Sequence, residues 1–166
     1  IVVQSLHKTL PSLTGTAISH INKQETKDKF DHALSIFQTS SPSYLLLASI
    51  DGCVHWLETD GERALNLWSD QLDKLREQTK ELLFCKIYSS DDFPDAYDFD
   101  KGKLMIAAKN GCSCGKIIYE TLRRQFMIEP ETATDTFCLL MTSPMDSQSD
   151  YQRLFRALQK IDKQIM

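Results

Sequence analysis

The spacing of the apolar residues changes near residue 83, and this change restricts the folds that are open to the chain. Between residues 62 and 82 the apolar side chains recur at intervals of three, four or seven positions, at Leu65, Trp68, Leu72, Leu75 and Leu82. This is the spacing of one face of a helix. After residue 83 the apolar runs 83–88 and 103–109 are short, which is typical of strands. The pattern predicts a long helix that leads into a small α/β domain, with a boundary near residue 83.

The segment before this helix alternates between strand and helix signals. We expect two strands and two helices there, at residues 1–5, 16–21, 25–37 and 44–56. Pro11 and Gly15 interrupt the stretch between the two strands and place Lys8 on a loop. Ser41 before Pro42 is a typical helix start, so the apolar segment that follows is predicted to be a mostly buried helix.

The last third of the chain shows the pattern of a helix, a strand and a second helix. Ser113 is a candidate N-cap for the first helix, residues 137–141 form an apolar strand, and Ser147 with Asp150 opens the final helix. One side of that helix is apolar, with Tyr151, Leu154, Phe155, Leu158, Ile161 and Ile165. We therefore expect a compact α/β lobe in which helices cover one face of a small sheet.

Composition excludes several classes of function. The 166 residues carry a net charge of −4, so the chain lacks the basic field that binds nucleic acid or an acidic membrane surface. No apolar run approaches the roughly 18 residues needed to cross a bilayer. The five cysteines form an odd set without paired CxxC spacing, so neither a disulfide framework nor a metal site is expected. These features predict a cytoplasmic protein.

One short segment combines the groups that covalent catalysis needs. Ser5, His7 and Lys8 lie within four residues, between two predicted strands. A lysine forms covalent linkages when its surroundings disfavour the ammonium form, and hydroxyl and imidazole groups can hold a phosphorylated cofactor beside it. The same residues are also compatible with an ordinary solvated turn, so the spacing alone leaves both interpretations open.

Two longer stretches resemble a known family. Residues 2–15, VVQSLHKTLPSLTG, resemble the cofactor-lysine segment of the bacterial ornithine/lysine/arginine decarboxylases, and residues 39–51, TSSPSYLLLASID, resemble a second segment at the distance expected in that family. Residues 103–106 and 122–131 resemble it less specifically. The sequence CSCG at residues 112–115 and Met127 depart from the family pattern, which leaves local substrate contacts open.

The resemblance implies a fold, a cofactor and site residues. It implies the fold type I (aspartate-aminotransferase-like) architecture of pyridoxal-phosphate enzymes and a homodimer or higher homo-oligomer. Lys8 would carry the pyridoxal 5′-phosphate, and Ser5 and His7 would contact its phosphate or hold the lysine segment. Thr39 and Ser40 would reach the phosphate of the partner's cofactor. A helix start exposes unpaired N–H groups that suit an anion, although the same residues can simply cap the helix.

The resemblance also implies a place in the family's longer polypeptide. Residues 1–83 would be the C-terminal part of the large domain with a long linking helix, and residues 84–166 the small C-terminal α/β domain. The family's ring-nitrogen aspartate and stacking histidine would precede Ile1, so we expect a fragment that is inactive alone. The implied substrate is lysine, arginine or ornithine. Two alternatives remain, a non-catalytic interaction module and another fold type I enzyme such as an aminotransferase.

Three further features have weaker functional interpretations. Cys112 and Cys114 near a helix start could have lowered thiol pKa values, although such a pair is more often incidental. The acidic stretch 91–100 could attract a cationic amino acid or could be a solvated loop. The remaining histidines have no evident acidic partner, so packing or solvent-facing roles are expected for His20, His32 and His55.

Overall fold

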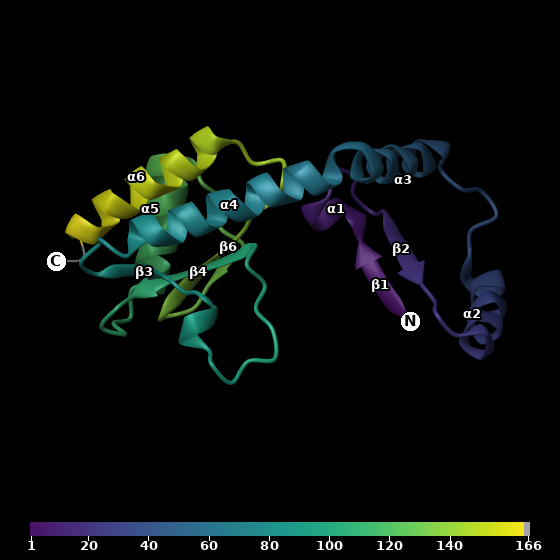
Figure 1. Cartoon of the computed structure of the whole chain (residues 1–166), viewed down its shortest axis with the longest axis horizontal. Coiled ribbons are helices and arrows are strands. Elements are labelled where there is room, and N and C mark those ends of the chain that lie inside the picture. The colour runs from purple at the N-terminus through teal and green to yellow at the C-terminus, as the bar shows by residue number, and fades with distance from the viewer. Residues whose placement is uncertain (165–166) are drawn as a thin grey trace. The chain divides into compact units, whose positions relative to one another are not determined.

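The computed structural model describes residues 1–164, which form two compact units (Figure 1). The first unit comprises Ile1–Glu62 and the second begins at Arg63. None of the helices within the described residues is long and apolar enough to cross a membrane.

The first unit opens with a β-hairpin that contains a single helical turn. Strands β1 (Val2–Ser5) and β2 (Ala17–His20) pair antiparallel, and the one-turn helix α1 (Leu6–Thr9) follows β1 directly. Gly15 has a φ of 94°, a conformation that L side chains rarely adopt, so it allows the chain to turn back into β2. Both predicted strands are confirmed. The prediction that Lys8 lies on a loop is wrong, because it lies in α1.

Two longer helices complete this unit. Helix α2 spans Gln24–Phe37, α3 spans Tyr44–Trp56, and a π-helical turn, η1 (Leu57–Gly61), follows. The predicted helices are confirmed, but the predicted cap of the second is wrong. Ser43, not Ser41, is the N-cap of α3, and its side chain accepts a hydrogen bond from the Leu46 N–H at 3.4 Å. Both serines carry the hydroxyl group that a helix start requires, and Ser43, two residues after Ser41, is the one that directly precedes the helix.

The first unit exposes most of its large apolar side chains. The prediction of a mostly buried α3 is wrong, since Cys53 is the only buried residue of that helix. Tyr44 is 82% and Phe37 85% exposed. The other exposed large apolar residues of the unit are Ile1, Val2, Val3, Leu13, Leu34, Ile36, Leu45, Leu47 and Val54. Periodicity identified the apolar positions, but it did not reveal that most of these side chains are exposed in this unit.

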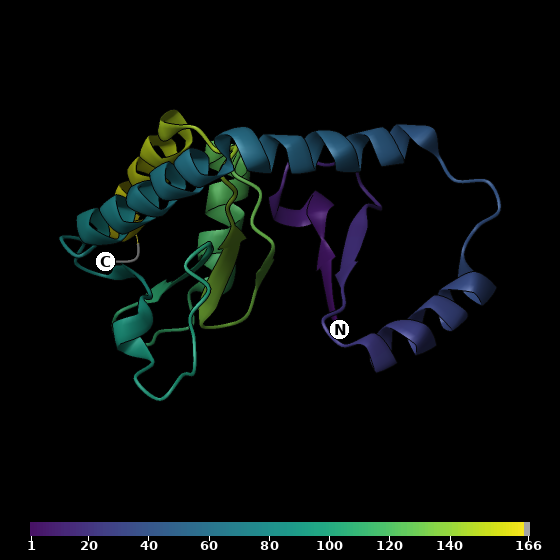
Figure 2. The same ribbon diagram turned by 45° about the vertical axis from the view of Figure 1, so that its right-hand side comes forward.

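The second unit is a four-stranded antiparallel sheet with helices on one face (Figures 1 and 2). The strands are β3 (Cys85–Ile87), β4 (Lys103–Ala108), β5 (Thr132–Ala133) and β6 (Phe137–Met141), in the order β3-β4-β6-β5. The helices are α4 (Glu62–Thr79), α5 (Gly115–Phe126) and α6 (Gln148–Gln164), and η2 (Ser90–Asp92) is a short 3-10 turn.

Alternate residues of the strands form the core of this unit. The register places Ile87 opposite Ile106 and Leu104 opposite Leu140, so these four side chains lie on one face of the sheet. All four are buried in one cluster with residues from each of the three helices. From the helices, this cluster includes Leu72, Leu75, Ile118, Leu122, Leu154, Leu158 and Ile161. The prediction of a small sheet covered on one face by helices is therefore confirmed.

The predicted elements of this unit differ from the structure in detail. Helix α4 ends at Thr79, so Leu82 contributes to the core from beyond the helix. Cys114, not Ser113, is the N-cap of α5. The two-residue strand β5 was not predicted, because a strand so short has no detectable alternation. Ile165, predicted on the apolar side of the last helix, lies outside the described residues.

The boundary between the compact units differs in position from the predicted domain boundary. The units divide between Glu62 and Arg63, so nearly all of α4 belongs to the second unit. The reason is that Leu72 and Leu75 of α4 pack in the core over the sheet. The assignment of residues 1–83 and 84–166 to two domains of a longer polypeptide stays a prediction.

We expect Gly115→Ala to destabilise the second unit by about 2–3 kcal/mol, the cost of overpacking a closely packed site. A Cβ atom at Gly115 would lie 2.4 Å from the Thr134 carbonyl oxygen and 2.5 Å from that of Phe137, and backbone atoms cannot easily move aside. Chemical denaturation followed by circular dichroism would measure the loss. Gly52→Ala in α3 is the matched control, because nothing lies within 4 Å of its Cβ position. Equal stability of the two variants would contradict this packing.

Candidate functional site

Helix α1 holds the candidate site residues His7 and Lys8, and Ser5 directly precedes it. The helix is fixed at its start by one buried side chain and one backbone carbonyl. Leu6 is fully buried. Its N–H donates to the Thr16 carbonyl oxygen at 3.1 Å, and the Leu10 N–H closes the turn on the Leu6 carbonyl oxygen at 3.2 Å. Leu6 thus anchors the start of α1 in the unit, while His7 is half-buried and Lys8 is exposed.

His7 is oriented by the same carbonyl. Its Nδ1 lies 2.8 Å from the Thr16 carbonyl oxygen. A carbonyl can only accept a hydrogen bond, so Nδ1 must carry the proton. In a neutral ring Nε2 is then an acceptor, and it becomes a donor only when the ring is doubly protonated. His7 therefore has one nitrogen committed to holding the segment and one free for a ligand.

Lys8 and Ser5 have side chains that are free to bind a ligand. Both side chains are exposed, and within residues 1–164 neither the Lys8 ammonium nor the Ser5 hydroxyl has a hydrogen bond or ion pair. Ser5 is the N-cap of α1, but its side chain makes no capping bond. The structure thus places one amine, one hydroxyl and one imidazole nitrogen without protein partners on a single short segment.

A network of three hydroxyl groups connects the turn after α1 to α3. Thr16 is 2% exposed, and its Oγ1 lies 2.7 Å from Ser12 Oγ and 2.8 Å from the Leu13 carbonyl oxygen. Ser12 Oγ lies 3.1 Å from Ser49 Oγ, and Ser49 Oγ accepts the Leu13 N–H at 2.8 Å. Sequence analysis did not identify these residues as site residues, because no local spacing relates Ser12 to a residue 37 positions away.

Thr39 and Ser40 lie on the connection between α2 and α3 and are both exposed. Thr39 Oγ1 accepts the Ser41 N–H at 3.1 Å, so this hydroxyl stabilises the turn. In both views the connection lies at the opposite end of the first unit from α1 (Figures 1 and 2). The structure therefore brings Ser5, His7 and Lys8 together but does not bring Thr39 and Ser40 to them.

The structure contradicts the lowered thiol pKa that was considered for Cys114 and agrees with the favoured interpretation of an incidental pair. This residue caps α5 but is 1% exposed. Burial raises the pKa of its thiol, and a hydrogen bond with Cys112 raises it further. The favourable position at a helix start is outweighed because the thiolate would have to exist in an apolar core. All five cysteines are unpaired thiols.

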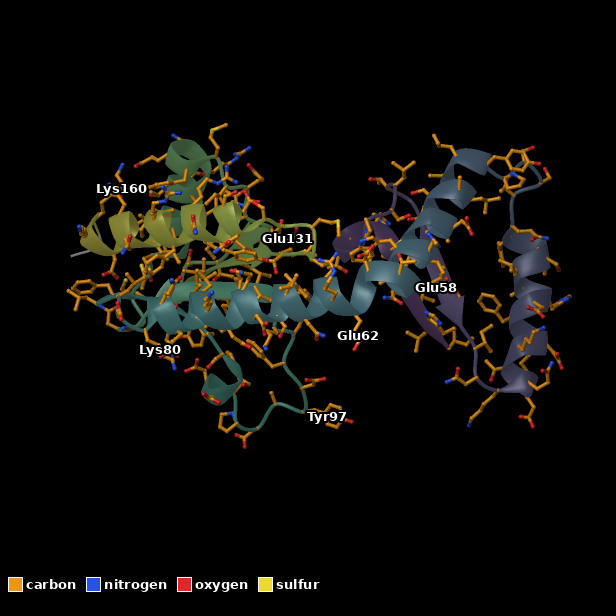
Figure 3. The ribbon with its side chains drawn as sticks, turned by 45° about the horizontal axis from the view of Figure 1, so that its top comes forward. Glu58, Glu62, Lys80, Tyr97, Glu131 and Lys160 are labelled. Atoms are coloured by element: carbon orange, nitrogen blue, oxygen red, sulfur yellow. The ribbon has the colours of Figure 1, made fainter. Side chains whose placement is uncertain are left out.

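The acidic stretch is organised mainly by its own local contacts. Asp92 forms an ion pair with Lys86 and accepts the Ser89 N–H, and Asp100 accepts the Gly102 N–H. Burial alone raises the pKa of Asp92, but the bonds from Lys86 and Ser89 outweigh it and lower the pKa. Tyr97 is fully exposed at the outer edge of this loop (Figure 3). These contacts favour a structural loop over a site that attracts a cationic substrate.

Comparison with known proteins decides the family. Residues 1–97 match the sequence model described as "Orn/Lys/Arg decarboxylase, major domain". The chain belongs to the Orn/Lys/Arg decarboxylase family. It is 35% identical over 172 residues to an arginine decarboxylase of Bacillus subtilis, a match that covers 99% of this chain and 34% of that protein. An arginine decarboxylase of Halalkalibacterium halodurans is 29% identical, over 95% of this chain and 33% of that protein.

Solved structures of the family share the fold. The constitutive lysine decarboxylase of E. coli matches with a TM-score of 0.81 and 20% identity, over 97% of this chain and 28% of that one. The lysine decarboxylase LdcF of Francisella novicida matches with a TM-score of 0.81 and 16% identity, over 97% of this chain and 27% of that one. The predicted α/β fold of the Orn/Lys/Arg decarboxylases is thereby confirmed. The chain spans about a third of the length of the curated relatives it matches.

The residues of α1 fit one end of a pyridoxal-phosphate site. A free amine on Lys8, with the Ser5 hydroxyl and His7 Nε2 beside it, matches the need for a covalent anchor and for phosphate ligands. A carboxylate for the cofactor's ring nitrogen is also required. Within residues 1–164 no carboxylate is bonded to Ser5, His7 or Lys8. Ser5, His7 and Lys8 thus fit the lysine end of this site in their chemistry, and none of the three is a carboxylate that could serve the ring nitrogen.

Proposed function

We propose that this chain supplies the cofactor-lysine part of a pyridoxal-phosphate-dependent decarboxylase of a basic amino acid, arginine, lysine or ornithine. The observation that carries the proposal is the position of Lys8, unpaired and exposed on α1, within the segment matched by the family's major domain. The arginine and lysine decarboxylases among the relatives support the substrate class. The product would be carbon dioxide and an amine of the polyamine type.

The residues of α1 would divide the work of holding the cofactor. Bound pyridoxal phosphate would supply an electron sink for the electron pair left behind when the substrate's carboxylate departs. Lys8 would anchor the cofactor through its unprotonated amine and release it to the incoming substrate amine. The Ser5 hydroxyl would donate to the phosphate. His7 would do so from Nε2 only as the doubly protonated ring, because Nδ1 is bonded to Thr16.

We propose that the complete protein is a homodimer or a higher homo-oligomer. The exposed apolar surface of the first unit supports this, since soluble proteins seldom leave residues such as Phe37 and Tyr44 in water. Thr39 and Ser40 lie between these two residues, away from α1, which suits a role at a partner's cofactor phosphate. Their exposed hydroxyl groups would bind that phosphate across the interface.

We place the protein in the cytoplasm and expect the isolated chain to be inactive. Five unpaired thiols suit a reducing compartment. Residues 1–83 would then be the C-terminal part of the cofactor-binding large domain and residues 84–166 the small domain. Inactivity is expected because the residues proposed to hold the cofactor, Ser5, His7, Lys8, Thr39 and Ser40, include no carboxylate that would keep its ring nitrogen protonated.

Release of carbon dioxide by the full-length product of the gene tests the proposal. We expect cofactor-dependent release from one of L-arginine, L-lysine and L-ornithine, and no release when pyridoxal phosphate is omitted. An aminotransferase would instead form a keto acid and no carbon dioxide. An interaction module would give neither product and no cofactor adduct after borohydride reduction. Either of these results would contradict the proposal.

A further inference from the structure

We propose that Ser49 is a positioning residue for Lys8. The inference rests on the proposed role of Lys8 as the cofactor lysine. Ser49 lies in the middle of α3, far from Lys8 in sequence, and its hydroxyl reaches the turn that follows α1. Through that turn it fixes the carbonyl that holds both Leu6 and His7.

The first step in this connection is the contact between α3 and the turn. Ser49 Oγ accepts the Leu13 N–H at 2.8 Å and lies 3.1 Å from Ser12 Oγ. One hydroxyl thus engages two consecutive residues. Ser49 is half-buried, and its helix is also N-capped by Ser43, so the hydroxyl projects from a regular element rather than from a loop. A group held on a helix positions its partner better than one on a loop.

The second step is the transmission from the turn to α1. Thr16 Oγ1 donates its single proton either to Ser12 Oγ at 2.7 Å or to the Leu13 carbonyl oxygen at 2.8 Å, and both acceptors belong to residues that Ser49 contacts. The Thr16 side chain is buried, so this bond is shielded from water. The carbonyl of the same residue accepts the Leu6 N–H and the His7 Nδ1–H.

The consequence is that α1 takes its orientation from α3. Lys8 follows His7 directly and has no side-chain partner in the described part of the chain, so only its backbone sets where the amine points. That backbone is one helical turn, which is too short to be stable by itself. Ser49, Ser12 and Thr16 therefore supply the rigidity that α1 lacks.

The connection from Ser49 through the turn to α1 is tested by amide hydrogen exchange. The rates are measured in the full-length product of the gene without cofactor. Ser49→Ala removes the hydroxyl and does not weaken α3, because alanine favours helices. We expect exchange at both Leu13 and Leu6 to become about three- to tenfold faster, the effect of losing one hydrogen bond. Ser49→Thr keeps the hydroxyl and should stay within about twofold of the original rates. Faster exchange at Leu13 with an unchanged rate at Leu6 would overturn the inference.

The control for this experiment is Ser35→Ala in α2. The Ser35 hydroxyl donates only to the His32 carbonyl oxygen of its own helix at 2.7 Å, so the same chemical change is made away from the network. We expect the exchange rates of Leu6 and Leu13 to be unchanged in this variant. An equal acceleration in both alanine variants would show a general loss of stability and would overturn the positioning role.

The effect on Lys8 is measured as the rate at which pyridoxal phosphate forms an adduct with it. The adduct is reduced with borohydride and mapped to Lys8. For Ser49→Ala we expect the rate at saturating cofactor to fall about three- to tenfold while the half-saturating concentration stays within about twofold, with recovery in Ser49→Thr. If Ser49→Ala formed the Lys8 adduct at the same rate as the unsubstituted protein, the positioning role would be overturned and the proposed function would remain intact. Absence of any Lys8 adduct in the unsubstituted protein would overturn the proposed function and this inference with it.

Discussion

Replacement of Lys8 by alanine is expected to abolish the borohydride-stable pyridoxal-phosphate adduct and to lower carbon dioxide release on the order of 10³-fold or more in the full-length product, because the covalent anchor is lost. Alanine favours helices, and the Lys8 side chain has no partner within residues 1–164, so α1 should remain folded. Peptide mapping of the reduced protein would give the labelled position.

Lys8→Arg distinguishes a role of the Lys8 amine as a nucleophile from a role of its positive charge. Arginine keeps the positive charge and favours helices, but its guanidinium cannot lose a proton in a protein and therefore cannot act as an amine nucleophile. We expect this variant to be as inactive as Lys8→Ala. Activity within about tenfold of the original would mean that Lys8 acts only through its charge, against the proposed covalent role.

Lys29→Ala is the matched control for labelling. Lys29 is an exposed lysine of α2, and no hydrogen bond or ion pair of its side chain is found in the described part of the chain. Its replacement should leave both the Lys8 adduct and the turnover unchanged. An adduct that moves to another lysine in Lys8→Ala, with turnover retained, would contradict the assignment of Lys8.

The second large effect concerns a buried carboxylate of the second unit, Asp162 in α6. It is 6% exposed and accepts three consecutive backbone N–H groups, from Leu83 at 2.9 Å, Phe84 at 2.8 Å and Cys85 at 2.6 Å. We expect Asp162→Ala to destabilise the unit by about 3 kcal/mol or more, because three charge-assisted bonds are lost and the buried Cys85 N–H is left unpaired. The melting temperature should fall by more than about 10 °C.

The contribution of Asp162 to the stability of the unit decreases as the pH falls. Burial alone raises the pKa of this carboxyl group, but the hydrogen bonds from Cys85, Leu83 and Phe84 outweigh it, so the pKa in the folded protein lies below its ordinary value of 3.8. The stabilisation is therefore complete above the ordinary pKa and is lost as the pH falls through the lower pKa of the folded state. Denaturation measured from about pH 5, where the stabilisation is complete, down to about pH 2 would follow this loss.

Asp162→Asn tests the origin of that pH dependence. Asparagine cannot titrate, so the variant should be less stable at neutral pH and should lose less additional stability on acidification. Asp70→Asn in α4 is the control, because Asp70 is exposed and no hydrogen bond or ion pair of its side chain is found within residues 1–164. Parallel pH curves for the original protein and Asp162→Asn would contradict this account.

The sequence was sufficient for the elements that carry their own periodic signal. Helix α4 was predicted from spacing, because its apolar residues repeat with the period of a helix, and strand β6 was predicted from its short continuous apolar run. The resemblance of residues 2–15 identified Lys8, since that segment is short and continuous. Details that depend on one hydroxyl, such as the choice of Ser43 over Ser41 as N-cap, were missed because two serines only two positions apart satisfy the same local rule.

Sequence alone also determined the family of this protein, because the residues that carry the resemblance lie in two continuous segments. Only the tertiary structure decided the surroundings of those residues. It paired Ser49 with Ser12, committed His7 Nδ1 to Thr16 and raised the thiol pKa of Cys114, which a helix start alone would lower. The physical reason is that burial and hydrogen bonding between distant residues follow from packing, and local spacing in a sequence carries no record of packing.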